Sequence, residues 1–158
     1  MMLPPWFEPG FTAELGEHCF EADEIIAFAR KFDPQPFHLD AELARKSAFG
    51  GLCASGWHTA SVWMRKQRDH SAIAIREWTE AGNPAYAFGP SPGFENLRWP
   101  RPVFAGETIE FSSQTLTCRP SASRPGWYVA TGLQQGHTLD DELVLSFQSS
   151  VFINYPAS

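Results

Sequence analysis

Residues 32–40, with the sequence FDPQPFHLD, bring together two side chains that can exchange protons. Asp33 and His38 stand five residues apart, on a stretch that Pro34 and Pro36 stiffen. Because the free pKa of histidine lies nearest neutrality, His38 can take up or release a proton at physiological pH. A nearby carboxylate can orient a shared water, and rigid backbone keeps such groups in register. The segment therefore favours general acid–base chemistry.

A purely structural interpretation of the same residues stays open. Asp33 could accept backbone N–H groups after a helix, and His38 could be a packed, hydrogen-bonded histidine. His58 lies early in a predicted helix beside Trp57, a position more typical of packing than of catalysis. No group of His, Cys, Asp and Glu has the spacing of a metal site, and no nucleophile elbow or phosphate loop occurs. We expect neither a metal nor a bound cofactor.

Helices come first along the chain. A helix is predicted over residues 23–30 with Asp23 as its cap, and a short one over residues 41–46 with Asp40 as its cap. A longer helix is predicted over residues 55–68, and residues 73–78 could extend it after a break. Its first turns hold small residues, which allow close approach to a sheet. Four residues supply an apolar stripe along it: Trp57, Ala60, Trp63 and Met64.

Apart from one short strand that precedes the helices, at residues 17–22, the strands follow them. Alternating or apolar runs predict strands at residues 17–22, 94–99, 107–118, 127–135 and 142–153, and residues 81–92 read as a loop. The alternation slips late in residues 107–118, which indicates a bulge. Helices followed by strands with tight returns predict an α+β fold, an antiparallel sheet with helices on one side. We expect an extended N-terminal arm, residues 1–10, and a single domain, residues 11–158.

The acid–imidazole segment resembles the signature of MaoC-like dehydratases and R-specific enoyl-CoA hydratases, which reads Asp-x-Asn-Pro-x-His-x-Asp. Four residues match it position for position: Asp33, Pro36, His38 and Asp40. Gln35 stands where the family has Asn, and it keeps an amide. In the family, the first Asp and the His of this signature form the catalytic pair.

Two later segments extend the resemblance over roughly residues 16–153. The family has His-Gly at the start of its central helix, where this chain has Ser55 and Gly56. Residues 101–108, RPVFAGET, resemble the family turn Pro-Val-x-x-Gly-Asp between strands. The resemblance implies a hotdog fold, in which an antiparallel sheet wraps a long central helix. It also implies pairing into a homodimer or a higher homo-oligomer.

By resemblance, the activity is reversible addition of water across the 2,3 double bond of an acyl-CoA thioester, in fatty acid metabolism. Catalysis would rest on Asp33 and His38. Residues expected to bind the substrate or its oxyanion are Ser55, Gly56, Gln35 and Phe37. Residues considered as contacts for the CoA phosphates are Arg98 and Arg101, for which solvated surface charge is the other interpretation. The substrate carries the CoA, so no separate cofactor is implied.

Two other functions stay open. Some thioesterases of the same fold carry their carboxylate on the central helix, whereas residues 54–68 here contain no Asp or Glu. That difference favours a hydratase, although other thioesterase layouts exist. A non-catalytic acyl-binding protein is the second alternative, and Ser55 in place of the family His is its best support.

Charge and composition narrow the partners. A net charge of −6 argues against a broad nucleic-acid or anionic-membrane surface. No apolar run reaches the roughly 18 residues of a membrane span, and the N-terminus lacks the pattern of a signal peptide. Three residues make up the cysteine complement, Cys19, Cys53 and Cys118, without short paired spacing. We therefore expect reduced cysteines in a cytoplasmic protein.

Overall fold

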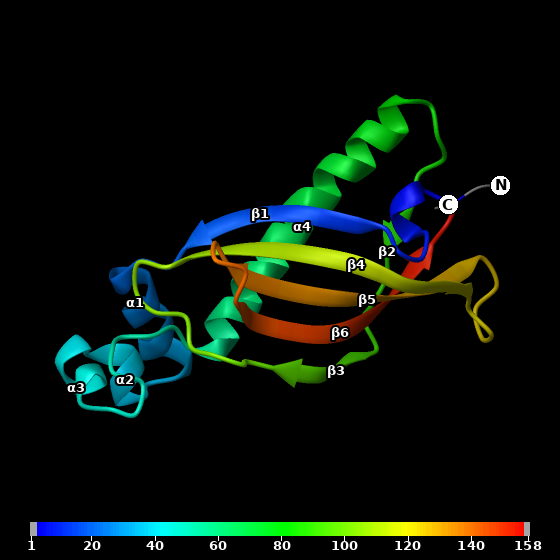
Figure 1. Ribbon diagram of the computed structural model, residues 1–158. Coiled ribbons are helices and arrows are strands. Elements are labelled where there is room, and N and C mark those ends of the chain that lie inside the picture. Colours follow the sequence, from blue (N-terminus) through cyan, green and yellow to red (C-terminus); the bar gives the residue numbers. More distant parts are fainter. Residues whose placement is uncertain (1–2, 157–158) are drawn as a thin grey trace.

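An antiparallel sheet and one long helix make up most of the molecule in a computed structural model that describes residues 3–156 (Figure 1). The six strands are β1 (Thr12–Cys19), β2 (Ala87–Phe88), β3 (Gly93–Arg98), β4 (Thr108–Pro120), β5 (Trp127–Thr138) and β6 (Leu143–Asn154). They follow the order β1-β4-β5-β6-β2, and β3 also pairs with β6. This α+β arrangement, an antiparallel sheet around a long helix, is the one predicted from the sequence.

The helices are α1 (Ala22–Phe32), α2 (Pro36–Leu39), α3 (Ala41–Arg45) and α4 (Gly56–Glu80), with a short 3-10 helix at Pro5–Phe7. Figure 1 shows α1, α2 and α3 gathered at one end of the sheet, close to the start of α4. The acid–imidazole segment therefore meets the N-terminus of the long helix at that end. None of the described helices combines the length and apolarity needed to cross a bilayer.

The predicted N-cap residues agree with the structure for one helix and differ for another. Asp40 caps α3 as predicted, because its carboxylate accepts hydrogen bonds from the N–H groups of Glu42 and Leu43. The prediction that Asp23 caps α1 is wrong: the helix begins one residue earlier, at Ala22, after an N-cap Glu21 that makes no side-chain hydrogen bond. Asp23 instead lies in the first turn, where its charge favours the helix dipole.

The long helix extends further than predicted. α4 runs unbroken through residues 69–80, so the predicted break before residue 73 is wrong. The predicted apolar stripe is only partly correct. Trp63 is 3% exposed, but Trp57 and Met64 are 52% and 51% exposed. At 100° per residue, Trp57 and Met64 lie roughly a third of a turn from Trp63, on either side of it, and are therefore less buried.

Local irregularities explain two further differences. Only residues 17–19 of the predicted strand at 17–22 are strand: they end β1, which already begins at Thr12, and Ala22 begins α1. A register shift beside Gly16, whose φ is +95°, interrupts the alternation and hides the first half. The bulge predicted in β4 is confirmed by a register shift between Thr115 and Thr117. At the N-terminus, the predicted extended arm is instead a 3-10 turn that buries Phe7; residues 1–2 of that arm lie outside the described residues.

Candidate active site

Asp33 and His38 meet because a helix end and a one-turn helix adjoin each other. Asp33 is the C-cap residue of α1, and its N–H donates to the carbonyl of Ala29. Pro36 begins α2, where its fixed φ suits a helix start, and His38 follows two residues later. His38 Nε2 then lies 3.4 Å from Asp33 Oδ2, and the Asp33 side chain remains 24% exposed.

A carbonyl group fixes the orientation of the His38 ring. Nδ1 lies 2.6 Å from the carbonyl oxygen of Cys53. Since a carbonyl only accepts, Nδ1 carries the proton and donates it when the imidazole is neutral. The lone pair is then on Nε2, the nitrogen that faces Asp33. His38 is only 7% exposed, so the ring is both oriented and confined.

When the imidazole is neutral, His38 Nε2 and the Asp33 carboxylate are both hydrogen-bond acceptors. Their separation of 3.4 Å is longer than the 2.7–2.9 Å of a strong charge-assisted hydrogen bond. A water molecule placed against both atoms can donate one proton to each. The geometry therefore suits a water held by two bases, and Asp33 is the partly exposed member of the pair.

Cys53 supplies its carbonyl to His38, but its thiol is a poor nucleophile. The Sγ atom lies 3.7 Å from His38 Nδ1. Burial raises the pKa of the Cys53 thiol to about 11. The thiol therefore stays protonated at neutral pH, and thiolate chemistry at this position is disfavoured.

A clamp of backbone hydrogen bonds holds residues 52–54. The Cys53 N–H donates to the carbonyl of Phe37, the residue before His38. On the other side, Ala54 N–H donates to Val103 O at 2.8 Å, and Ala105 N–H donates to Leu52 O at 2.9 Å. The position of the Cys53 carbonyl thus depends on the loop before β4.

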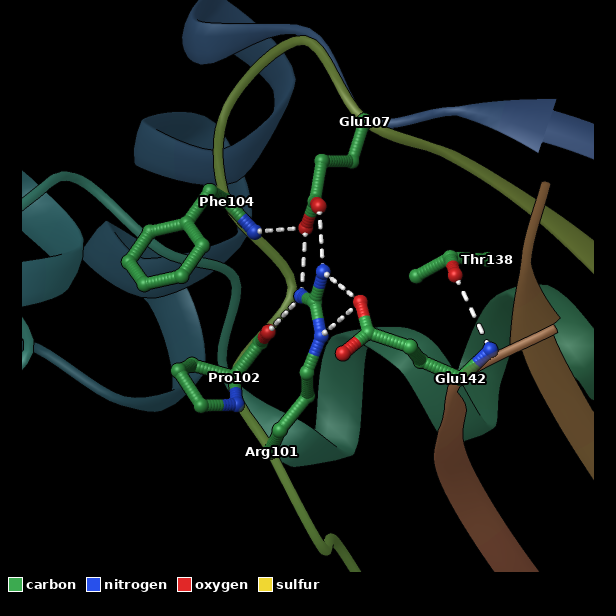
Figure 2. Close-up of polar contacts among 6 residues, drawn as sticks. All are labelled: Arg101, Pro102, Phe104, Glu107, Thr138 and Glu142. Atoms are coloured by element: carbon green, nitrogen blue, oxygen red, sulfur yellow. Dashed lines mark hydrogen bonds and ion pairs between the residues drawn. The ribbon is translucent and has the colours of Figure 1, made fainter. Parts of the chain in front are cut away.

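Arg101 anchors that loop, as Figure 2 shows. Its guanidinium donates to both carboxylate oxygens of Glu107, at 2.8 and 2.7 Å, and to Glu142 Oε2 at 3.0 Å. Glu107 Oε2 also accepts the Phe104 N–H at 2.8 Å. The hydrogen bonds to Glu107, foremost, raise the pKa of Arg101, and those from Arg101 lower the pKa of Glu107. The guanidinium of Arg101 is thus occupied by two carboxylates, whereas Arg98 is exposed.

Ser55 and Gly56 lie at the start of α4, as the sequence predicts. Ser55 is the N-cap residue and is 1% exposed, but its Oγ has no hydrogen-bond partner within the described residues. No acceptor for the Gly56 N–H occurs in that part of the chain either. A Cβ at position 56 would lie 2.4 Å from the Trp99 ring, so Gly56 is also required by the packing of Trp99.

The two remaining predicted residues occupy different environments. Gln35 is the N-cap residue of α2 and is exposed, with no side-chain hydrogen bond to that helix. Phe37 is partly buried and packs edge-on against His38 and Phe49, with ring centroids 4.6 and 4.9 Å apart. Phe37 therefore lines one side of the His38 imidazole, and Gln35 is exposed to solvent at the edge of the candidate site.

A second imidazole–carboxylate cluster lies between β1, α1 and α4. Glu24 Oε1 accepts hydrogen bonds from His18 Nε2 at 2.6 Å and from His58 Nε2 at 3.1 Å. His58 is 5% exposed and stacks on Phe28, which confirms its interpretation as a packed histidine. Sequence reasoning missed the roles of His18 and Glu24, because they lie on different elements and His58 follows Glu24 only 34 residues later in the chain. Neither this cluster nor any other group of three His, Cys, Asp or Glu side chains in residues 3–156 is arranged to hold a metal ion.

Comparisons with known proteins agree with this architecture. The crystal structure of a MaoC-like dehydratase from Rhodospirillum rubrum is similar to this chain, with 35% sequence identity and a TM-score of 0.71. The match covers 93% of this chain and 92% of that one. The (R)-hydratase of A. caviae, involved in PHA biosynthesis, shares the fold at 23% identity and a TM-score of 0.64, over 94% and 98% of the two chains. The uncharacterised protein YdeM of Bacillus subtilis is 27% identical over 131 residues, 83% of this chain and 84% of that one. The MaoC-like domain pattern itself matches residues 8–126. The chain is therefore a member of the MaoC-like domain family, with the hotdog fold.

Proposed function

We propose that the protein is an acyl-CoA hydratase/dehydratase that adds water reversibly across the 2,3 double bond of an enoyl thioester. One observation carries the proposal: His38 Nδ1 is committed to the Cys53 carbonyl, which leaves Nε2 free as a base 3.4 Å from the Asp33 carboxylate. Family membership supports the general reaction type, hydration or dehydration. The choice of an enoyl-CoA as the substrate is what the proposal adds.

In the proposed hydration, His38 Nε2 and Asp33 hold the water that attacks the β-carbon. One of the two takes a proton from that water, and one of the two returns a proton to the α-carbon, so that each turnover leaves the pair in its starting protonation state. Because both groups face one water, the same proton can pass between them without another carrier. Dehydration follows the same path in reverse.

Negative charge develops on the thioester oxygen during this reaction and needs preorganised donors. We assign that role to the Gly56 N–H, at the positive end of the α4 dipole, and place Ser55 beside it. The buried Ser55 hydroxyl has no partner in the described chain and can donate to the same oxygen. Gln35 and Phe37 would contact the substrate at the rim, and Arg98 would contact a CoA phosphate.

Assembly and location are part of the proposal. Five exposed apolar side chains occur in the segments around the proposed site: Phe32, Leu43, Phe49, Trp57 and Trp99. Apolar surface of this kind favours association, so we propose a homodimer or higher homo-oligomer whose contacts help to enclose the site. Light scattering at micromolar concentration should return more than a monomer. Free Cys19, Cys53 and Cys118 support a reducing, cytoplasmic location.

Incubation with crotonyl-CoA tests the activity. Hydration removes the enoyl absorbance and releases no thiol, which is the expected result. Release of free CoA thiol would instead indicate a thioesterase. Retention of the absorbance without free thiol, although the folded protein binds the thioester, would favour the acyl-binding alternative.

A further inference from the structure

A cavity of about 360 Å³ lies between the middle of α4 and the sheet, at the lower end of the usual size range of small-molecule sites. Its lining includes Met64, Gln67 and Ser71 from α4 and Gln134 and Ser149 from β5 and β6. None of the residues assigned above to the proposed active site is part of that lining. The cavity is therefore a separate feature of the molecule, although α4 runs past both.

Apolar walls make up much of the cavity. Aromatic side chains from the 3-10 helix, α4, β2, β3 and β6 line it: Trp6, Phe7, Trp63, Phe88, Phe94 and Phe147. Trp63 is the first α4 residue in the lining, and its ring packs edge-on against Phe147 at 4.8 Å. An apolar molecule, chain or ring, would gain free energy by leaving water for such a space.

Two buried amide oxygens in the lining lack hydrogen-bond partners within the described residues: Gln67 Oε1 and Gln134 Oε1. Trp6 also lines the cavity, but its indole N–H can donate to the Tyr86 hydroxyl. Outside the cavity, only Ser55 and His58 have a buried polar side-chain atom without a partner in residues 3–156. Buried polar groups without partners are unfavourable and therefore rare in folded proteins. Their gathering around one cavity indicates that a ligand supplies the missing hydrogen bonds.

Gln134 defines what the ligand must offer. The residue is 5% exposed, and its Nε2 donates to Ser149 Oγ at 3.1 Å, which leaves Oε1 to accept a hydrogen bond. Rotating the amide by half a turn exchanges the two atoms but still leaves one of them unmatched. A hydroxyl group satisfies either orientation, because it can both donate and accept.

We propose that this cavity binds a mostly apolar molecule that carries a hydroxyl group, which pairs with Gln134. At ~30 Å³ for each water-sized group, the space holds about a dozen non-hydrogen atoms. Two sources share this chemistry: a free small alcohol, or the far end of a hydroxylated acyl chain. Gly56 and Gln67 are separated by about 16 Å of helix, roughly the length of a twelve-carbon chain.

Two probes of equal size test the site, octan-1-ol and heptyl methyl ether, since only the alcohol can donate a hydrogen bond. Binding is followed by the fluorescence of Trp6 and Trp63 and by calorimetry, neither of which requires turnover. We expect the alcohol to bind about tenfold more tightly, the effect of one hydrogen bond to an otherwise unmatched group. Gln134→Leu should remove this preference and leave the affinity for the ether unchanged.

Ser71→Phe is the second variant, because it fills the cavity from α4 without changing Gln134. It should weaken both probes by more than tenfold while the circular dichroism stays that of a folded protein. Equal binding of the two probes to the unaltered protein, or no binding of either, would overturn the proposal. So would an alcohol preference that survives Gln134→Leu.

A third measurement separates the two sources, and this arm alone rests on the proposed function. Dodec-2-enoyl-CoA is compared with its 12-hydroxy analogue as a substrate. A higher kcat/KM for the hydroxylated thioester that Gln134→Leu abolishes assigns the cavity to the substrate's acyl chain. Equal kcat/KM values, with the octan-1-ol preference intact, assign it to a free alcohol. Failure of hydration altogether would count against the proposed function, whereas the binding result would stand.

Discussion

Two buried histidines at the same end of the molecule, His38 and His58, differ in which nitrogen is left free. They are 7% and 5% exposed, and each has a carboxylate within 3.5 Å of Nε2. In His38, the Cys53 carbonyl fixes the proton on Nδ1 and leaves Nε2 as a base toward Asp33. In His58, Nε2–H donates to Glu24, and Nδ1 is buried without a hydrogen-bond partner among residues 3–156.

The difference shows that burial and an acid neighbour do not by themselves make a catalytic histidine. What matters is whether the free nitrogen faces a space that a water or substrate can enter. Asp33 is partly open to solvent, whereas Phe20 and Phe28 pack against the His58 ring. Burial lowers the pKa of His58 despite the opposing effect of Glu24, so that ring stays neutral as a packed element.

The largest expected effect comes from breaking the His38 pair. Asp33→Asn and His38→Gln should each lower turnover of crotonyl-CoA by on the order of a hundredfold or more, a usual contribution of general acid–base catalysis. Melting temperatures should change little, because both substitutions keep size and some hydrogen bonding. His58→Gln is the matched control and should keep its activity per folded molecule. If the Asp33 and His38 variants melt early but stay active, the pair only stabilises a turn.

A second variant weakens the loop that holds the Cys53 carbonyl against His38, and it changes neither His38 nor His58. Arg101→Met releases Glu107 and loosens the loop whose backbone bonds hold Cys53. We expect kcat to fall about tenfold and stability to fall by about 1–2 kcal/mol, the range for hydrogen bonds to charged groups at a partly exposed site. KM should stay nearly constant. A rise in KM with kcat unchanged would instead indicate phosphate binding by Arg101.

Arg65→Met provides the control for that experiment. Arg65 pairs with Asp69 on the exposed face of α4, where both side chains are more than half exposed. Exposed pairs of this kind contribute little, so stability should change by no more than about 0.5 kcal/mol and kcat should not change.

Glu24→Ala tests the other histidine of the comparison, His58. It leaves the buried His58 Nε2–H without its acceptor, which should cost about 1–2 kcal/mol in urea unfolding. Turnover per folded molecule should be unaffected, because the Asp33–His38 pair does not use this cluster. Asp23→Ala, an exposed position in the same helix, should cost less than about 0.5 kcal/mol. A large loss of kcat in Glu24→Ala would show that the two clusters are coupled.

The smallest effect is a pH dependence of stability. Because the pKa of His58 is lowered in the folded protein, the unfolded chain binds a proton first as the pH falls below about 6.5. His58 therefore does not reduce the free energy of unfolding above about pH 6.5. Below that pH its protonation in the unfolded chain lowers the free energy of unfolding, by at most about 1.4 kcal/mol per pH unit. His58→Phe, which keeps the ring but cannot titrate, should flatten the decline. An unchanged slope would assign the decline to other groups.

Much of the site follows from local sequence. Residues 32–40 contain their own turn, because Pro36 begins a one-turn helix and Asp40 caps the next, so Asp33 and His38 are brought together within a few residues. The start of α4 beside Ser55 was likewise predictable. The burial of α4 was harder to predict, because polar residues such as His58 and Ser71 lie on its buried side and weaken the apolar period.

The sequence by itself determined the order of α1, α3, α4 and the five longer strands, and the acid–imidazole pair with its spacing, since each depends on residues that are close in the chain; it did not predict α2 or the two-residue strand β2. Only the tertiary structure decided how His38 is oriented, because Cys53 lies fifteen residues later and is held in turn by the loop before β4. The same holds for the His18–Glu24–His58 cluster and for the cavity, which combine α4 with strands far away in sequence. Hydrogen bonds and cavity walls between distant segments leave no periodic signal, because no local spacing records which segments the fold will bring together.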